Sequence, residues 1–148
     1  GHTAIAAMLL DKGAAVGDKD ELGRTALMYA CESGHTAIAA MLLDKGAAVG
    51  DKDELGRTSF MFACEFGHTA IAFMLVEKGA AVGDKDDLGR TALMYACMSG
   101  HTATAAMLVE KGAAAGDKGN LGRTALMYAC MSGHTATAAM LVEKGAAA

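Results

Sequence analysis

Histidine and cysteine, the residue types best able to bind metal ions or act as nucleophiles, recur along this sequence at a fixed interval of 33 residues. Imidazole nitrogens and thiolates are common zinc ligands, two neighbouring cysteines can form a disulfide, and a cysteine beside a histidine can act as nucleophile and base. Each of these requires the side chains to lie within a few ångströms of one another, so the fold decides among them. The residues are His2, His35, His68, His101 and His134, and Cys31, Cys64, Cys97 and Cys130.

These residues recur because nearly the whole chain repeats without insertion or deletion. The stretch LGRT begins at four positions and the stretch GHTA at five, and both keep the same interval. A fixed period of this length is typical of proteins built from stacked copies of one supersecondary unit. We therefore divide residues 1–148 into a single array with a half repeat at 1–19 and repeats at 20–52, 53–85, 86–118 and 119–148.

Each unit predicts two short helices followed by a loop. Thr25 is a favoured helix N-cap, the stretch ALMYACE after it is rich in helix formers, and Gly34 ends this first helix. Residues 36–45 predict a second, amphipathic helix, and Gly46 stands where a helix C-terminus favours positive φ. The following loop, AAVGDKDELG, has two glycines and a charged centre, which favours a β-turn or hairpin-like finger.

The repeated unit resembles the ankyrin repeat, whose 33-residue unit combines a β-turn with two helices and carries a T-P-L-H-x-A stretch. The corresponding stretches here are TALMYA at Thr25, Thr91 and Thr124 and TSFMFA at Thr58, and GHTAIAAMLLDKGAAV is similar to the family's second helix and its exit. The family's proline is replaced by alanine or serine, and its histidine by methionine. The resemblance covers essentially the whole chain and implies an all-α repeat fold, a solenoid of stacked helix pairs with β-turn or hairpin fingers.

Stacking separates the histidines, and the cysteines, too widely for members of either set to cooperate. Packed helices lie roughly 10 Å apart, whereas zinc ligands lie about 2 Å from one ion and bridged cysteine Cα atoms less than about 7 Å apart. Gly34 also breaks the helix between Cys31 and His35, so no helical geometry pairs them. We expect no catalytic, metal or cofactor site. We expect each histidine to hydrogen-bond the loop of its own or the next unit, and the cysteines to be small buried side chains.

Charge and hydropathy argue against two further classes of function. Thirteen Lys and Arg against seventeen Asp and Glu give a net charge of −4, whereas nucleic-acid binding needs a basic surface. Each AIAAMLL-type stretch ends at DKG or EKG, short of the roughly 18 residues that span a bilayer. Unpaired cysteines and the lack of a signal-peptide pattern favour an intracellular protein. The first residue is Gly rather than Met, and we expect the chain to be a section of a longer array.

Binding of another protein is the function that the resemblance implies. Ankyrin repeats bind partners in a concave groove lined by the fingers and first helices, and the contact residues are placed here by their match to that surface. Each unit offers a leucine and an arginine there, with the alternative that the leucine packs beneath its own finger. The predicted partner-binding residues are Leu22, Arg24, Leu55, Arg57, Glu65, Phe66, Phe73, Leu88, Arg90, Met98, Leu121, Arg123 and Met131.

All four phenylalanines lie in the repeat at 53–85. Phe60 and Phe62 replace residues at core positions of the other units, which predicts a local change in packing. Phe66 and Phe73 replace serine and alanine at positions expected to face solvent. A partly exposed aromatic ring at such a position is a candidate anchor for a partner.

A structural role in self-assembly is the alternative function. The outer face of the second helix carries Thr36, Ala37 and Ala40 where soluble ankyrin arrays usually carry Glu and Lys, and neither end has a polar capping repeat. Uncapped ends of this kind favour stacking of identical chains into a filament, because a head-to-tail contact that does not close continues indefinitely. The expected partner is then another protein or a copy of this chain.

Later units replace an inward isoleucine by threonine. Ile5, Ile38 and Ile71 correspond to Thr104 and Thr137. Each replacement removes apolar area and buries a hydroxyl group, so we expect it to destabilise its unit by about 1–2 kcal/mol.

Overall fold

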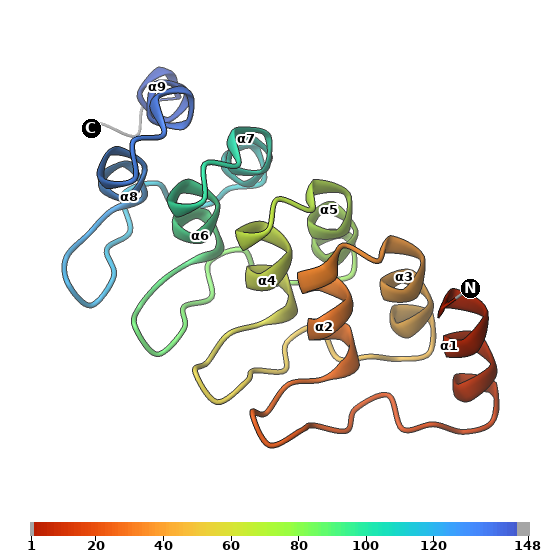
Figure 1. Ribbon diagram of the computed structural model, residues 1–148. Helices are drawn as coiled ribbons and strands as arrows, with labels where there is room; N and C mark the ends of the chain where they lie inside the picture. Colours follow the sequence, from red (N-terminus) through yellow and green to blue (C-terminus); the bar gives the residue numbers. More distant parts are fainter. Residues whose placement is uncertain (1, 145–148) are drawn as a thin grey trace.

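The computed structural model describes residues 2–144 and contains helices and loops over that range, with one isolated β-bridge between Lys52 and Thr58. The helices form two layers along one stack, and fingers project beside the first helices (Figure 1). This arrangement confirms the predicted all-α repeat of stacked helix pairs. Residue 1 of the predicted half repeat and residues 145–148 of the last predicted repeat lie outside the described residues. The helices are α1 (His2–Asp11), α2 (Ala26–Ser33), α3 (Thr36–Asp44), α4 (Ser59–Glu65), α5 (Thr69–Glu77), α6 (Ala92–Met98), α7 (Thr102–Glu110), α8 (Ala125–Met131) and α9 (Thr135–Glu143).

The first helices α2, α4, α6 and α8 begin in the same way. The hydroxyl oxygen of Thr25 accepts a hydrogen bond from the backbone N–H of Met28 at 3.3 Å, and the corresponding threonines cap the other three helices. This bond satisfies one of the N–H groups that the start of a helix leaves without a partner. Alanine or serine follows each threonine, and the helices form without the family's proline.

The core lies between the two layers and between successive units. Leu27, Phe60 and Leu93 of the first helices are almost fully buried, as are Leu75 and Leu108 of the second helices. Each first helix packs on the next first helix and on the second helix of its own unit. The solenoid therefore has one continuous core built from contacts between neighbouring units.

Two of the histidines, His68 and His134, link their units to the preceding ones by hydrogen bonds. The ring Nε2–H of His68 donates to the carbonyl of Glu32 at 3.1 Å, and that of His134 donates to the carbonyl of Met98 at 3.0 Å. The acceptor therefore lies at the end of the preceding first helix, which corrects the expected bond to a loop of the same or the next unit. The imidazole also covers the glycine after that helix, because a Cβ added to Gly34 would lie 2.5 Å from the His68 ring. Glycine is needed there both for this contact and for its φ of 76°.

Each finger closes in a tight turn that is bonded to the turn of the next unit. In the first finger, the N–H of Gly23 donates to the carbonyl of Asp20 at 2.9 Å, and the Asp20 carboxylate accepts from the N–H groups of Leu22 and Arg24. Between units, the N–H of Glu54 donates to the carbonyl of Leu22 at 3.1 Å, and the same bond recurs at the next two junctions. Backbone groups thus supply much of the polar link between fingers.

Thr104 and Thr137 are buried as expected, but their hydroxyl groups have partners. The Oγ1 atom of Thr104 lies 2.7 Å from that of Thr69, and the Oγ1 atom of Thr137 lies 2.7 Å from that of Thr102. These bonds between second helices offset the desolvation of the hydroxyls, so the expected destabilisation reduces to the lost apolar contact. Ile5, expected to be buried, is 54% exposed because neither a first helix of its own unit nor a preceding second helix packs on α1 within the described residues.

The fourth finger lacks the carboxylate of the other three, which leads to a prediction about stability. Gly119 stands where the other fingers have Asp20, Asp53 and Asp86, and a Cβ added there would meet the Gly89 carbonyl oxygen at 3.5 Å, an ordinary contact. We expect Gly119→Asp to raise the free energy of unfolding by about 1–2 kcal/mol, because the carboxylate accepts backbone N–H groups and the unfolded chain loses flexibility. Urea denaturation measures the change. The reverse substitution, Asp86→Gly, is the matched control and should lower stability, and an unchanged urea midpoint for Gly119→Asp would contradict the prediction.

Candidate functional site

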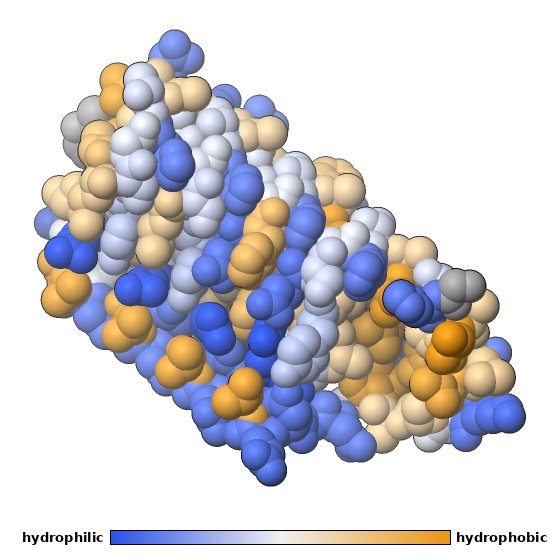
Figure 2. All heavy atoms as spheres, in the orientation of Figure 1, coloured by the Kyte–Doolittle hydropathy of each residue, from blue (hydrophilic) through white to orange (hydrophobic). Residues whose placement is uncertain are grey.

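A row of exposed leucines on the finger turns is the first feature of the predicted partner-binding surface. The four side chains are 54–73% exposed, and each stands on a turn whose backbone is held by hydrogen bonds. Figure 2 shows apolar patches following one another along this edge of the stack. Of the two alternatives for these leucines, the structure has them exposed rather than packed beneath their fingers. This leucine row consists of Leu22, Leu55, Leu88 and Leu121.

The arginines of the same turns do not form a second exposed row, which corrects the sequence-based expectation. The Arg24 side chain is 11% exposed and forms an ion pair with Glu32. Its guanidinium carbon lies 4.2 Å from the ring centre of Tyr29 and 4.4 Å from that of Phe62. Arginine is attracted both to aromatic faces and to carboxylates, and the first helices offer both beside the finger. The partly buried arginines are Arg24, Arg57, Arg90 and Arg123.

In the repeat at 53–85, which contains the phenylalanines, an ion pair replaces a hydrogen bond that is present in the first full unit. In the first unit, the Tyr29 hydroxyl donates to the Asp20 carboxylate, and this bond, with backbone N–H donors, lowers the pKa of Asp20. Phe62 has no hydroxyl, and in that unit Arg57 Nε lies 2.9 Å from the Asp53 carboxylate. The Phe62 ring is 2% exposed, as its predicted core position requires. The predicted change in packing therefore also changes the group that the finger carboxylate binds, from the Tyr29 hydroxyl at Asp20 to the Arg57 guanidinium at Asp53.

A small hollow of about 220 Å³ lies between the second and third fingers. Its walls include Leu55 and Leu88 of the leucine row together with Arg57 and Arg90. Glu65 also lines the hollow and is half-buried, and burial raises the pKa of its carboxyl. The hollow therefore presents a partly desolvated carboxyl group next to two exposed apolar side chains.

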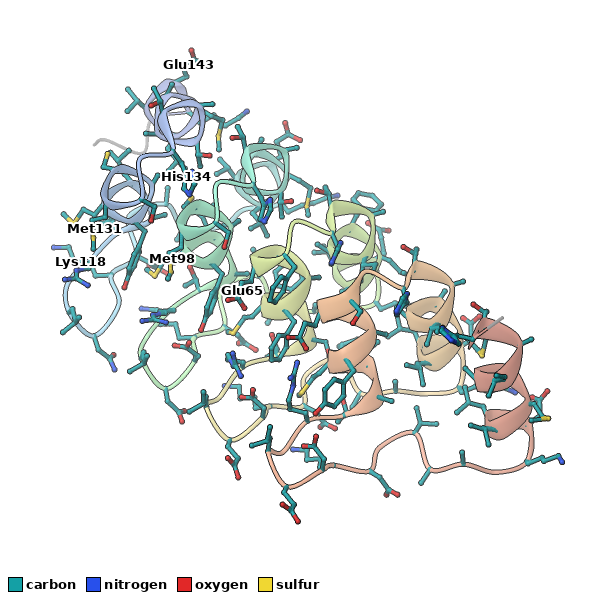
Figure 3. All side chains as sticks on the ribbon, viewed as in Figure 1. Glu65, Met98, Lys118, Met131, His134 and Glu143 are labelled. Atoms are coloured by element: carbon teal, nitrogen blue, oxygen red, sulfur yellow. The ribbon has the colours of Figure 1, made fainter. Side chains whose placement is uncertain are left out.

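The ends of the first helices change character along the stack. Glu32 and Glu65 occupy this position in the first two full units, whereas Met98 and Met131 occupy it in the last two. Figure 3 shows Glu65, Met98 and Met131 following one another along this layer. Met98 is half-buried and Met131 is 60% exposed, while Phe66 beside Glu65 is 43% exposed. This surface is therefore acidic toward the N-terminus and apolar toward the C-terminus.

Phe73 lies apart from the other predicted contact residues. It is 45% exposed on α5, a second helix, and the Lys111 ammonium lies 4.7 Å from the centre of its ring. The fingers and first helices belong to the other layer (Figure 1). The structure thus brings the leucine row, Glu65, Phe66 and the methionines together in one layer and leaves Phe73 outside it.

The cysteines are suited to packing rather than to chemistry. Cys31, Cys64 and Cys97 are free and buried, and burial raises the pKa of Cys31 and of Cys97 to about 12. Such thiols are protonated near neutral pH and therefore react poorly. Cys130 departs from the expected burial and is exposed, because no further unit covers α8 in the described part of the chain.

Residues 2–144 contain neither a cluster of metal ligands nor a helix that could span a membrane. There, no three or more His, Cys, Asp or Glu side chains are grouped so that they could hold a metal ion. None of the helices in this range has the length and apolar character needed to cross a membrane.

An apolar groove at the N-terminal end was not predicted from the sequence. It has a volume of about 450 Å³ and lies between α1, α2 and α3; we call it the end groove. Leu9 and Tyr29 line it and are 51% and 41% exposed. Figure 2 shows apolar side chains around a hollow at this end. The signal in the sequence was the half repeat at 1–19, which has a second helix without a first, but that pattern indicated only an uncapped end.

We predict that a thiol reagent distinguishes Cys130 from the other cysteines. Iodoacetamide should add one label quickly to the folded chain, because the remaining thiols become accessible only when the chain opens. Intact-mass spectrometry counts the labels, which avoids the identical tryptic peptides that contain Cys97 and Cys130. A Cys130→Ala chain should gain no rapid label, and the urea-unfolded parent should gain four. Two or more rapid labels on the folded parent would contradict the observed burial.

Comparison with known protein families accounts for the repeated architecture. The family model described as Ankyrin repeats (3 copies) matches residues 1–86 and again residues 60–148, so the two matches cover the chain. Among curated protein sequences, none gives a significant match. Ankyrin repeat domains are generally protein–protein interaction modules and are typically non-catalytic. The matching pattern over the whole sequence and the stacked helix pairs show that the chain belongs to the ankyrin repeat family.

Proposed function

We propose that the chain is a non-enzymatic scaffold that binds another protein through the leucine row and the adjacent first helices. The observation that carries this proposal is the row itself, in which four leucines on consecutive turns are each more than half exposed. Exposed apolar side chains gathered over one surface often mark an interaction site. Aliphatic side chains at regular intervals suit an extended partner segment with apolar residues of its own.

The rigidity of the fingers supports this proposal. Hydrogen bonds of 2.9–3.1 Å join each finger turn to the next, and Arg24, Arg57 and Arg90 hold their turns against aromatic rings of the first helices. A surface that is already ordered loses little conformational entropy when a partner binds. The arginines contribute to this surface mainly by positioning it, and the leucines provide the apolar contact.

The two ends of this surface differ in charge and hydropathy, so a partner would bind it in one orientation. We expect basic or hydrogen-bond-donating groups of the partner near Glu65 and apolar groups near Met98 and Met131, because the first-helix ends change from acidic to apolar. Phe66 is the proposed aromatic anchor between these regions. Phe73, in the other layer, remains a proposed contact only for a partner that extends over the second helices.

A double variant, Leu55→Ser with Leu88→Ser, tests the scaffold proposal. Short random peptides displayed on phage and selected on the parent chain should be rich in apolar residues. The double variant should bind the selected peptides at least about tenfold more weakly, because burial of each leucine contributes about 1.5–3 kcal/mol. Val142→Ser on α9, at a side chain that is 53% exposed, is the control and should leave binding unchanged. Equal binding by the parent and a folded double variant would refute the role of the leucine row.

Stacking of identical chains is the second candidate function. The observation that favours it is the outer face of α8, where Met127 is 48% exposed while the corresponding Met28, Met61 and Met94 are 0–2% exposed. Light scattering during serial dilution separates the two candidates. The mass of a single chain at all concentrations supports the scaffold, whereas long polymers that are lost in a Met127→Glu variant support assembly.

A further inference from the structure

The carboxylate of Glu65 lacks the partner that its counterpart in the preceding unit has. Glu32 holds the same repeat position and forms an ion pair with Arg24, eight residues before it. The arginine eight residues before Glu65 is Arg57, and its Nε atom instead lies 2.9 Å from the Asp53 carboxylate. Among the described residues, the Glu65 side chain forms neither an ion pair nor a hydrogen bond.

The cause of this difference is one missing hydroxyl group. In the first full unit, the Tyr29 hydroxyl donates to the finger carboxylate of Asp20, and the Tyr95 hydroxyl does the same in the repeat at 86–118. Phe62 holds this position in the repeat at 53–85 and has no hydroxyl, and there Arg57 binds the finger carboxylate. The acidic side chain at the end of α4 is therefore left free by a change in the core of the stack.

Glu65 lines the hollow between the second and third fingers, and the same hollow has apolar walls. Leu55 and Leu88 flank it, and both are more than half exposed. The N–H of Asp87 donates to the carbonyl of Leu55 at 2.9 Å, so a backbone hydrogen bond holds the two fingers at this spacing. The hollow therefore offers an unpaired carboxylate between two apolar side chains whose positions are already fixed.

The charges around the hollow favour a cation as its occupant. Its lining includes three carboxylates and two guanidinium groups, and one of these guanidinium groups, that of Arg57, is paired with Asp53 outside the lining. The other, that of Arg90, lies over the Tyr95 ring. Negative charge is therefore in excess, and an anion in the hollow would add to it. Burial raises the pKa of the Glu65 carboxyl, and a nearby cation would offset this cost of its ionised form.

We propose that this hollow receives one lysine or arginine side chain of the protein partner. The cationic end pairs with Glu65, and the hydrocarbon stem packs between Leu55 and Leu88, since long basic side chains bury their stems along apolar surface. The inference rests on the function proposed for the leucine row and adds one residue class at one position of the bound segment. That segment carries a basic residue with apolar residues beside it.

Selection of short random peptides displayed on phage is the first test. On the folded parent chain, lysine or arginine should appear at one position, next to apolar residues, at least about threefold above its frequency in the unselected library, as a partly desolvated ion pair predicts. Selection on Glu65→Gln should lose this enrichment. The matched control is Glu77→Gln on α5, which removes one charge from the layer of second helices and should keep the enrichment.

A double-mutant cycle separates a direct pair from a general effect of charge. One selected peptide is synthesised with its basic residue and with methionine in that place, and fluorescence anisotropy measures both on the parent and on Glu65→Gln. The substitution in the chain should weaken binding of the basic peptide at least about threefold and leave binding of the methionine peptide unchanged, because only groups in contact give non-additive effects.

Phe62→Tyr tests the cause without altering any side chain that lines the hollow. The added hydroxyl should donate to Asp53, as the tyrosines of the neighbouring units do to their finger carboxylates, and so release Arg57 to pair with Glu65. The basic peptide should then bind at least about threefold more weakly, and the methionine peptide should bind as before. Circular dichroism establishes that each variant is folded.

The outcomes distinguish this proposal from the one on which it rests. Peptides that depend on Leu55 and Leu88 but carry no basic residue at a fixed position would overturn the proposed occupant and leave the scaffold proposal standing. Enrichment of acidic residues at that position, or equal binding of the basic peptide by the parent and a folded Glu65→Gln chain, would overturn it in the same way. If no selected peptide depends on the leucine row, both proposals fail.

Discussion

Every first helix of this chain has two opposite apolar faces, and its own second helix cannot cover both. One face carries Tyr29 or its equivalents toward the preceding unit, and the other carries Met28 and Cys31 or their equivalents toward the next. Each unit therefore depends on neighbours on both sides to bury its apolar surface. The finger turns and the histidines depend on the same stacking, because their bonds between units form only when successive helices lie side by side.

Stacking also determines which side chains remain exposed and available to bind a partner. Backbone groups of the finger turns are used within the finger and in bonds to the next finger, and Arg24 and Arg57 are used in ion pairs and in contacts with aromatic rings. The leucine on each turn has no such role and points away from the core. In the middle of the stack, the charged residues hold the fingers in place and the apolar leucines stay exposed. This explains why the arginine of each Leu and Arg pair is less accessible than the leucine, although arginine is the more polar residue.

The repeat period was sufficient to predict the fold but not the contacts across each junction. The threonine caps, the glycine after each first helix and the two-helix unit depend on residues close in sequence, and these were predicted. The bond between Thr69 and Thr104 joins residues 35 positions apart, and the acceptor of His68 lies 36 positions before it. Such pairs depend on how far each unit is rotated and shifted relative to its neighbour, and a periodic pattern contains no information about that. The exchange of Tyr29 for Phe62, with Arg57 replacing the lost hydroxyl at Asp53, lies within one unit and was missed for another reason: the sequence offers the finger carboxylate several nearby donors and does not show which of them it binds.

The same residue has different roles at different places in the stack, although the units are nearly identical in sequence. Leu141 is fully buried beneath a first helix, whereas Leu9 at the same repeat position is half exposed; Met94 is core, whereas Met127 is half exposed. Position along the array, rather than residue type, therefore determines whether a side chain stabilises the fold or is available for binding. A repeat unit that stacks tightly therefore leaves apolar side chains exposed wherever no neighbouring unit covers them within the described residues.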